Sequence, residues 1–211
     1  MSSTPKKEAA VHLEDLEGSF FWEKYKLWII ALIFVGLAAA IFYTYARVTK
    51  ASLNTKAQQF FDVQETTEDL QKVVDQYPGT PASAQALLFM GGKFYYDQKW
   101  DKAINAYTKF LQLFPQHDFA PNALMGLGAV YEAKGELDLA LAQYKKVFEQ
   151  FPQSYRAAEA RLAVGQVYER QGMKAQAKQT YESIPAAYPQ SVWRNFAAEQ
   201  LKRLESEKKS S

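Results

Sequence analysis

The sequence predicts an all-α protein in which one N-terminal transmembrane helix is followed by an α-solenoid of stacked helical hairpins. Two observations carry this prediction. An apolar run without a charged residue occupies positions 27–46, and an aromatic–proline pair returns every 37 residues in the rest of the chain. The first pattern is typical of a membrane span, and a fixed period of this size is the signature of a repeat architecture.

The two patterns divide the chain into five parts. In order they are a short tail (1–26), the transmembrane helix (27–46), a leading helix with a half-repeat (47–78), three units of 37 residues (79–189), and a capping helix with its tail (190–211). In the leading part we expect the first helix to run to about Phe61 and a lone second helix to cover Thr66 to Gln76. The closing helix is expected from Ser191 to Glu205.

The apolar run is long enough to cross a bilayer. Its 20 residues would span about 30 Å as a helix, the thickness of the hydrocarbon core, and ten of them are Leu, Ile, Phe or Val. A buried core helix would normally keep a polar stripe. A cleaved signal peptide would have a shorter apolar stretch and fewer acidic residues before it, although Ala38, Ala39 and Ala40 weakly resemble a cleavage site. Aromatic side chains typical of membrane interfaces flank the run at Trp22, Tyr25, Trp28, Tyr43 and Tyr45.

Lysine and arginine are almost equally frequent on the two sides of the run, so the positive-inside rule barely discriminates between orientations. Long domains are translocated with little regard to their charge. We therefore expect a cytoplasmic N-terminus and a repeat domain on the outer side of the membrane.

Each repeat is predicted to be a helix A followed by a helix B. Ala86, Met90 and Phe94 would form the apolar stripe of the first helix A, and Phe110 would lie on the stripe of the first helix B. Small residues at facing positions allow the two axes to approach closely. The columns repeated at 37-residue steps are Gly91, Gly128 and Gly165; Ala103, Ala140 and Ala177; Tyr107, Tyr144 and Tyr181; and Pro78, Pro115, Pro152 and Pro189.

Turn residues punctuate this pattern. Gly135 and Gly172 would supply the positive φ that a helix C-terminus often needs, whereas Gln98 takes their place in the first unit and should strain or reshape the turn. Each proline ends a helix B, because proline lacks an N–H group and disfavours helix in the residue before it. N-caps of the following helices are expected at Thr80, Ser154 and Ser191.

These columns resemble the tetratricopeptide repeat (TPR), whose frame is matched by Leu127-Gly128, Tyr131, Ala140, Tyr144 and Pro152. The resemblance implies that the helices A line a concave face that binds other proteins. Some TPR proteins hold a C-terminal carboxylate with Lys and Asn, but Leu88 and Gly92 occupy the matching positions, so that clamp is missing. Of the groove positions, Tyr95, Tyr96 and Met125 are the favoured contact residues. The full set carried over is Gln85, Leu88, Gly92, Tyr95 and Tyr96; Asn122, Met125, Ala129, Glu132 and Ala133; and Glu159, Leu162, Gln166, Glu169 and Arg170.

No pattern indicates a catalytic, cofactor or metal site. The chain has no cysteine, which excludes disulfides, thiolate sites and lipoprotein anchoring. His12 and His117 do not form a metal-spacing pattern, and His117 is interpreted as a solvated loop residue; Asp97, Glu132 and Glu169 are likewise expected in solvent. From Val48 onward the chain has 20 Lys and Arg and 18 Asp and Glu, so it is nearly neutral. No basic surface for nucleic acid is therefore predicted.

The layout as a whole resembles a bacterial family of single-pass TPR proteins associated with the Sec translocon. This resemblance implies an inner-membrane accessory scaffold with a periplasmic repeat domain, whose partners are the translocon and periplasmic chaperones. Two alternatives stay open. One is a periplasmic scaffold for envelope assembly or cell division, and the other is a cytoplasm-facing TPR adaptor with the opposite topology.

Overall fold

A computed structural model describes residues 5–62 and 66–210 of the chain. Within these ranges every regular element is an α-helix and no strand is present, which confirms the predicted all-α fold class. The chain forms two compact units, one ending at Leu53 and one beginning at Asn54, and each is described by itself.

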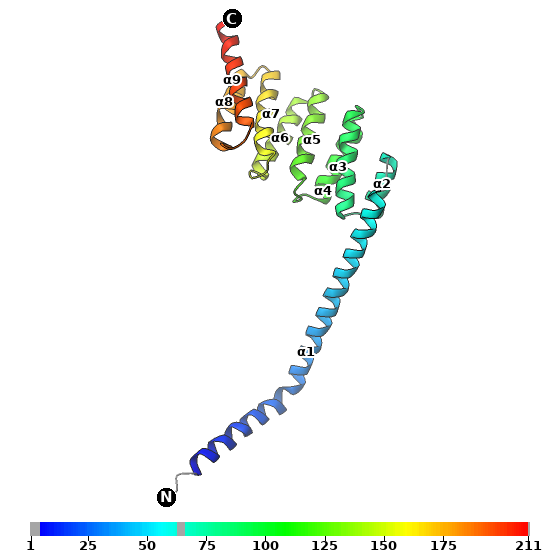
Figure 1. The fold of residues 1–211 in the computed structure, drawn as a ribbon, viewed down its shortest axis with the longest axis vertical. Coiled ribbons are helices and arrows are strands. Elements are labelled where there is room, and N and C mark those ends of the chain that lie inside the picture. The colour runs from blue at the N-terminus through cyan, green and yellow to red at the C-terminus, as the bar shows by residue number, and fades with distance from the viewer. Residues whose placement is uncertain (1–4, 63–65, 211) are drawn as a thin grey trace. The chain divides into compact units, whose positions relative to one another are not determined.

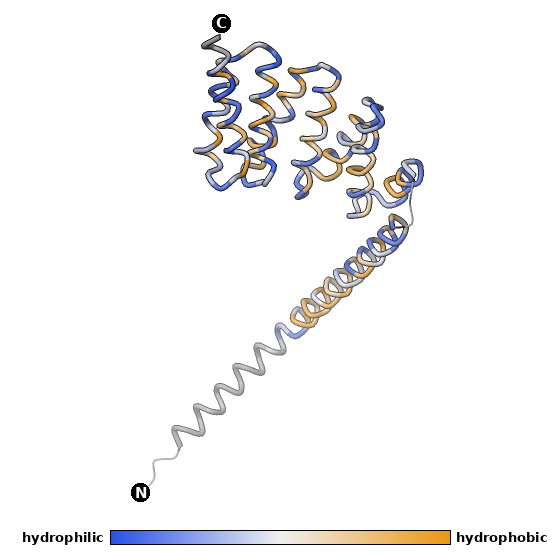
Figure 2. The backbone as a smooth tube through the Cα atoms, turned by 45° about the horizontal axis from the view of Figure 1, so that its top comes forward, coloured by the Kyte–Doolittle hydropathy of each residue, from blue (hydrophilic) through white to orange (hydrophobic). Residues whose placement is uncertain are grey.

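The first unit consists of the long helix α1 (Pro5–Asp62), which continues past the unit boundary. Its segment Lys24–Gln59 is long and apolar enough to cross a membrane, and its most apolar stretch is not buried at all within the molecule. Figure 2 shows this stretch as a continuous band of hydrophobic residues. The predicted span 27–46 lies inside the segment. Thr44, the hydroxyl residue near its end, donates to the carbonyls of Ala40 and Ile41 (3.0 and 2.9 Å), so its polar group is satisfied within the helix.

The second unit is a row of short helices in chain order (Figure 1). Helices α3–α4, α5–α6 and α7–α8 are three antiparallel hairpins. Their first members also contact one another, α3 with α5 and α5 with α7, and α7 contacts the closing helix α9. The bounds are α2 (Thr67–Gln76), α3 (Pro81–Tyr96), α4 (Trp100–Leu113), α5 (Ala120–Ala133), α6 (Leu137–Gln150), α7 (Ala157–Arg170), α8 (Lys174–Ala187) and α9 (Trp193–Ser210).

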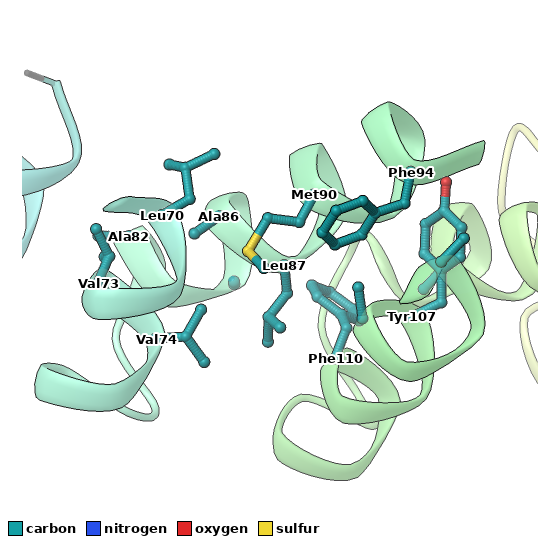
Figure 3. Close-up of a cluster of buried hydrophobic side chains, with 14 of the residues drawn as sticks. Leu70, Val73, Val74, Ala82, Ala86, Leu87, Met90, Phe94, Tyr107 and Phe110 are labelled. Atoms are coloured by element: carbon teal, nitrogen blue, oxygen red, sulfur yellow. The ribbon is translucent and has the colours of Figure 1, made fainter. Parts of the chain in front are cut away.

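The core at the start of this unit is built from three neighbouring helices. Side chains of α2, α3 and α4 point toward one another, among them Val73, Leu87 and Phe110 (Figure 3). Ala57, in the last turns of α1, is completely buried in the same cluster, and Phe61 packs against it. The last turns of α1 therefore contribute to this core.

The recurring glycines have a role that differs from the prediction. We expected small residues at these positions to let the two helix axes approach each other closely. Instead a tyrosine ring of helix B lies directly on each glycine, because a Cβ added at Gly128 or Gly165 would lie 2.3 Å from the ring of Tyr144 or Tyr181. Gly91 and Tyr107 repeat the arrangement at 2.6 Å.

The helix ends follow the aromatic–proline pairs and the turn residues. Helices α2, α4, α6 and α8 are each capped by the aromatic residue before the proline. Between helices A and B, Gly135 and Gly172 have φ of 79° and 74°. Gln98 adopts the same left-handed conformation with φ of 57°, so the first turn is strained rather than reshaped.

The predicted N-caps are only partly present. Thr80 caps α3, and its hydroxyl oxygen accepts the N–H of Ser83 (3.3 Å). Ser154 and Ser191 are not N-caps, since their helices begin at Ala157 and Trp193. Each serine hydroxyl instead accepts the backbone N–H of the residue two positions later: Ser154 accepts that of Arg156 (3.2 Å), and Ser191 that of Trp193 (3.3 Å).

His117 occupies the same position of the repeat, 37 residues after Thr80 and before Ser154. Its Nδ1 atom accepts the N–H of Phe119 (3.1 Å), and its ring packs against the rings of Phe110 and Phe114. It is half-buried. His117 is therefore a turn residue with defined partners, not the freely solvated side chain that we expected.

Candidate partner-binding groove

A groove of about 540 Å³ crosses the row of helices A. It is lined mainly by residues of α5 and α7, with single side chains from α3, α4, α6, α9 and the turn before α7. Two further predicted positions, Ala129 and Leu162, also line it. The candidate contact residues that the structure brings together in its wall are Leu88, Asn122, Met125, Glu132, Glu159 and Gln166.

An apolar row runs along this groove. Leu88, Met125 and Leu162 occupy the same position in three successive units, 37 residues apart. Leu88 and Met125 are half-buried, whereas Leu162 is 5% exposed and belongs to a core cluster. Leu162 thus packs between helices, and Leu88 and Met125 keep surface that a partner can cover.

The groove wall also contains two core tyrosines, Tyr107 and Tyr144. The hydroxyl of Tyr144 donates to one carboxylate oxygen of Glu132 (2.9 Å), and the guanidinium of Arg170 donates to the other (2.8 Å). Burial, and secondly the negative charge of Glu132, raises the pKa of Tyr144 well above its ordinary value. Burial likewise raises the pKa of Tyr107.

The same arrangement recurs one unit later, outside the groove. Tyr181 donates to Glu169 (2.5 Å), which also pairs with Arg203 of α9. Burial, followed by the hydrogen bond to Glu169, raises the pKa of Tyr181. The expectation that these two glutamates are solvated is therefore wrong: Glu132 and Glu169 each hold a helix-B tyrosine and an arginine from the next helix A. Asp97 is bonded as well, to Lys99 (3.0 Å).

The remaining candidates lie away from the groove wall. Tyr95 packs edge-on against the ring of Trp100 (5.5 Å between centroids), and Tyr96 is 87% exposed. Gln85 is exposed on α3, while Glu169 and Arg170 serve the networks between units. Gly92 and Ala133 are exposed and outside the wall.

Besides the core tyrosines, sequence reasoning missed Arg156 and Trp193 as groove residues. Arg156 pairs with Glu159 (2.7 Å), and Trp193 closes the far end of the groove from α9. They are 37 residues apart and share the position of Phe119. That position lies just before helix A or at its first residue. Continuing the predicted groove positions by one helical turn toward the N-terminus would have identified both Arg156 and Trp193.

The chemistry of the groove is that of a binding surface. Both carboxylates of its wall are paired with an arginine, Glu159 with Arg156 of the wall and Glu132 with Arg170 beside it, so the negative charge is compensated. Among the described residues no group of three His, Cys, Asp or Glu side chains is placed to hold a metal ion. Apolar side chains and the amides of Asn122 and Gln166 can contact a chain segment without selecting strongly for charge.

Stacked antiparallel hairpins with a groove along their first helices define a TPR-type solenoid, which is a protein-interaction scaffold. The chain belongs to the tetratricopeptide repeat-like domain family, whose sequence model matches residues 20–206. No curated protein matches the chain in sequence.

Solved structures show the same fold at low identity. A tetratricopeptide repeat protein from Parabacteroides merdae ATCC 43184 superposes with a TM-score of 0.54 at 20% identity, covering 75% of this chain and 60% of that one. The TPR domain of Sgt2 from Aspergillus fumigatus gives 0.51 at 23% identity, with 63% and 84% covered. At these identities the likeness concerns the fold alone.

Proposed function

We propose that this protein is a single-pass bacterial inner-membrane scaffold, anchored by residues 27–46, whose periplasmic TPR domain assists protein export at the Sec translocon by holding segments of partner proteins. The observation that carries this proposal is the groove across α3, α5 and α7 with its half-buried Leu88 and Met125. The unburied apolar stretch of α1 supports the anchor. The family match beginning at residue 20 includes that stretch.

The chemistry of the groove favours uncharged, extended segments. An extended peptide can place alternate side chains on Leu88 and Met125 and offer its backbone to the amides of Asn122 and Gln166. Newly exported chains expose such segments before they fold. A periplasmic chaperone could then receive them, which is the handover role that the resemblance implies.

Photoreactive side chains at Met125 and Gln166 test the partner in living cells. We expect crosslinks to translocon subunits or to chains in export from both positions, identified by mass spectrometry. Leu139 is the matched control, because it is 46% exposed on α6 and is not part of the groove wall. Crosslinks only to proteins of outer-membrane assembly or division would support the envelope scaffold instead, and identical products from Leu139 would remove the role of the groove.

Topology and anchoring are tested separately. Protease added to intact spheroplasts should digest the repeat domain, and survival of that domain until lysis would support the cytoplasm-facing adaptor. The intact chain should be recovered from membranes at its full mass of 24.0 kDa. A shorter product beginning near Ala40 would show that the apolar run is a cleaved signal.

A further inference from the structure

The tyrosines of the three helices B differ in what their hydroxyl groups bind. Tyr144 and Tyr181 donate to the carboxylates of Glu132 and Glu169 (2.9 and 2.5 Å). The side chain of Tyr107 is only 8% exposed, yet its hydroxyl makes no hydrogen bond to any residue that the structure describes. Burying a hydroxyl without a partner is costly, so an acceptor brought by a ligand would stabilise the complex.

The sequence explains why Tyr107 differs from the other two tyrosines. The position one repeat before Glu132 is Tyr95, which has no carboxylate to offer. Tyr95 packs edge-on against the ring of Trp100 (5.5 Å between centroids). The first unit therefore keeps the tyrosine of the repeat but lacks the glutamate that accepts from it in the later units.

The ring of Tyr107 is held between two helices A. A Cβ atom added at Gly91 of α3 would lie 2.6 Å from this ring, and one added at Gly126 of α5 would lie 2.3 Å from it. Figure 3 shows its hydroxyl oxygen pointing away from Phe110. Tyr107 also lines the groove. A donor that is fixed in this way before binding loses little freedom when a partner arrives.

The groove wall next to this hydroxyl has almost no side chains. Gly126 and Ala129 line the groove about one turn apart on α5, and the atom nearest to a Cβ added at Gly126 is the ring carbon of Tyr107 that bears the hydroxyl. One repeat later the same two positions are Ala163 and Gln166. A bound backbone can therefore approach the groove wall more closely in the first unit than one unit later.

A neutral acceptor suits this place better than a carboxylate. Arg156 is the one basic side chain among the described residues of the wall, and it already pairs with Glu159 (2.7 Å). A carboxylate of a partner would lose its water without gaining a free counter-charge. The carbonyl of an extended backbone is neutral and lies between successive side chains, so a segment can meet Tyr107 while its side chains cover Leu88 and Met125.

We propose that Tyr107 is a specificity-determining residue of the groove, whose hydroxyl donates to one backbone carbonyl of an extended, uncharged segment of a partner protein. This hydrogen bond fixes the register of the segment along the apolar row. The inference rests on the groove of the proposed function as the binding site, and it does not depend on the role in export.

The test uses the full chain in lipid nanodiscs and a fluorescein-labelled, uncharged peptide of leucine, serine and glycine. A length of about twelve residues spans about 40 Å when extended. We expect saturable binding by fluorescence anisotropy, and Tyr107→Phe, which keeps the ring and removes the donor, should weaken it about three- to tenfold. Because the hydroxyl has no partner within the described chain, the same variant should unfold at an equal or higher urea concentration than the parent.

Tyr181→Phe is the matched control. It removes the same atom from the same repeat position outside the groove, where the hydroxyl is bonded to Glu169. It should lower the urea midpoint and leave peptide binding unchanged. The two variants therefore separate a contact with the partner from a contact within the fold.

Peptides in which one carbonyl oxygen at a time is replaced by sulfur, a weaker acceptor, locate the hydrogen bond. In the parent chain one such replacement should weaken binding several-fold, and in Tyr107→Phe the same replacement should have no effect, because the donor is already gone. Equal effects in parent and variant would show that a different donor contacts that carbonyl, which overturns the proposal.

Two further outcomes distinguish this inference from the groove itself. Unchanged binding in Tyr107→Phe, together with lost binding in Met125→Glu, would overturn the role of Tyr107 and keep the groove. Absence of saturable binding by the parent chain would overturn the groove and this inference with it. A lower urea midpoint for Tyr107→Phe would show that its hydroxyl is bonded within the fold, and the proposal would fail on that ground alone.

Discussion

Gln98 stands where the later units have Gly135 and Gly172, and it shares their left-handed backbone conformation. For a residue with a Cβ atom this conformation costs about 1–2 kcal/mol. Glycine adopts it freely but loses more entropy on folding, which offsets part of the gain. The first hairpin is therefore folded against a local strain that its neighbours do not have.

Gln98→Gly should raise the free energy of unfolding by roughly 0.5–1 kcal/mol, because the relief of strain exceeds the added entropy of the unfolded chain. Urea denaturation of the full chain in detergent, followed by circular dichroism, measures this difference. The reverse change, Gly135→Ala, should lower stability by about 1 kcal/mol. A lower urea midpoint for Gln98→Gly would mean that the glutamine side chain contributes more than its backbone costs.

Gly91 and Gly92 are neighbours in α3 with different surroundings. A Cβ at Gly91 would lie 2.6 Å from the ring of Tyr107, whereas at Gly92 the nearest atom is the hydroxyl of Tyr107 at 3.9 Å. Gly91→Ala should therefore destabilise the fold by about 1–3 kcal/mol through overpacking. Gly92→Ala should be neutral or stabilise it by up to about 1 kcal/mol, since alanine is the better helix former. Equal effects of the two changes, measured by the same urea denaturation, would contradict the ring-on-glycine packing.

At the scale of elements, the tyrosine of each helix B joins its own helix A to the next one. Tyr144 and Glu132 belong to one hairpin, and Arg170 of the following helix A completes the set. Tyr181, Glu169 and Arg203 repeat it. The exposed arginine pairs are worth little by themselves, but the tyrosine hydroxyls are held in the interior, where an unpaired group would be costly.

This network predicts a loss of stability at alkaline pH. The pKa values of Tyr144 and Tyr181 are raised in the folded state, so the unfolded chain releases their protons first, above about pH 10. The contribution of each tyrosine to the free energy of unfolding is therefore fully present below that pH. It falls as the pH rises further, by up to about 1.4 kcal/mol per pH unit for each tyrosine.

The double variant Tyr144→Phe with Tyr181→Phe should be less stable near neutral pH, by about 1 kcal/mol per lost hydrogen bond, but should lose less stability between about pH 9 and pH 11. Urea denaturation of the full chain across this range measures both effects, and the lysines titrate equally in parent and variant. Parallel pH profiles of parent and variant would show that these tyrosines do not hold their protons more tightly when folded.

The order of helices could be predicted because the residues that end them, an aromatic–proline pair and a glycine, act through local backbone geometry. The packing of side chains between helices was harder to predict from the sequence. The ring of Tyr144 on Gly128 depends on how two helices meet in space, and the spacing of the two residues in the chain does not specify it. Arg156 and Trp193 line the groove from the same repeat position but are chemically unlike, so no shared residue type indicated that position.

The candidate groove was predictable in part for a related reason. Met125 and Gln166 lie in the wall because they follow the register of a regular helix A. Tyr95 and Tyr96 follow it as well, yet Tyr95 packs on Trp100 and the exposed Tyr96 lies outside the wall. The first unit has only the end of α1 and α2 before it, and this difference at the array's edge cannot be read from a repeat column.

Viewed as a whole, the repeat body is a one-dimensional chain of contacts. Among the described helices from α2 to α9, each contacts only those one or two places along the chain. Polar pairs link successive hairpins on their rims, such as Lys134 with Asp101 (3.2 Å) and Gln171 with Asp138 (2.8 Å). In such an array stability is the sum of local terms and nearest-neighbour interfaces, so damage at one end should stay near that end.

Ala197→Asp tests this prediction at the C-terminal end. Ala197 is completely buried where α9 covers Tyr181 and Ile184, and a carboxylate there should detach α9. Hydrogen exchange of the full chain in detergent should then become at least about tenfold faster in α7, α8 and α9 and remain unchanged in α3 and α4. Ala198→Asp is the matched control, because the next residue of the same helix is exposed and should tolerate the charge. Uniform loss of protection from α2 to α9 in Ala197→Asp would instead show that the array unfolds as one cooperative unit, and the capping role of α9 would then extend to every hairpin.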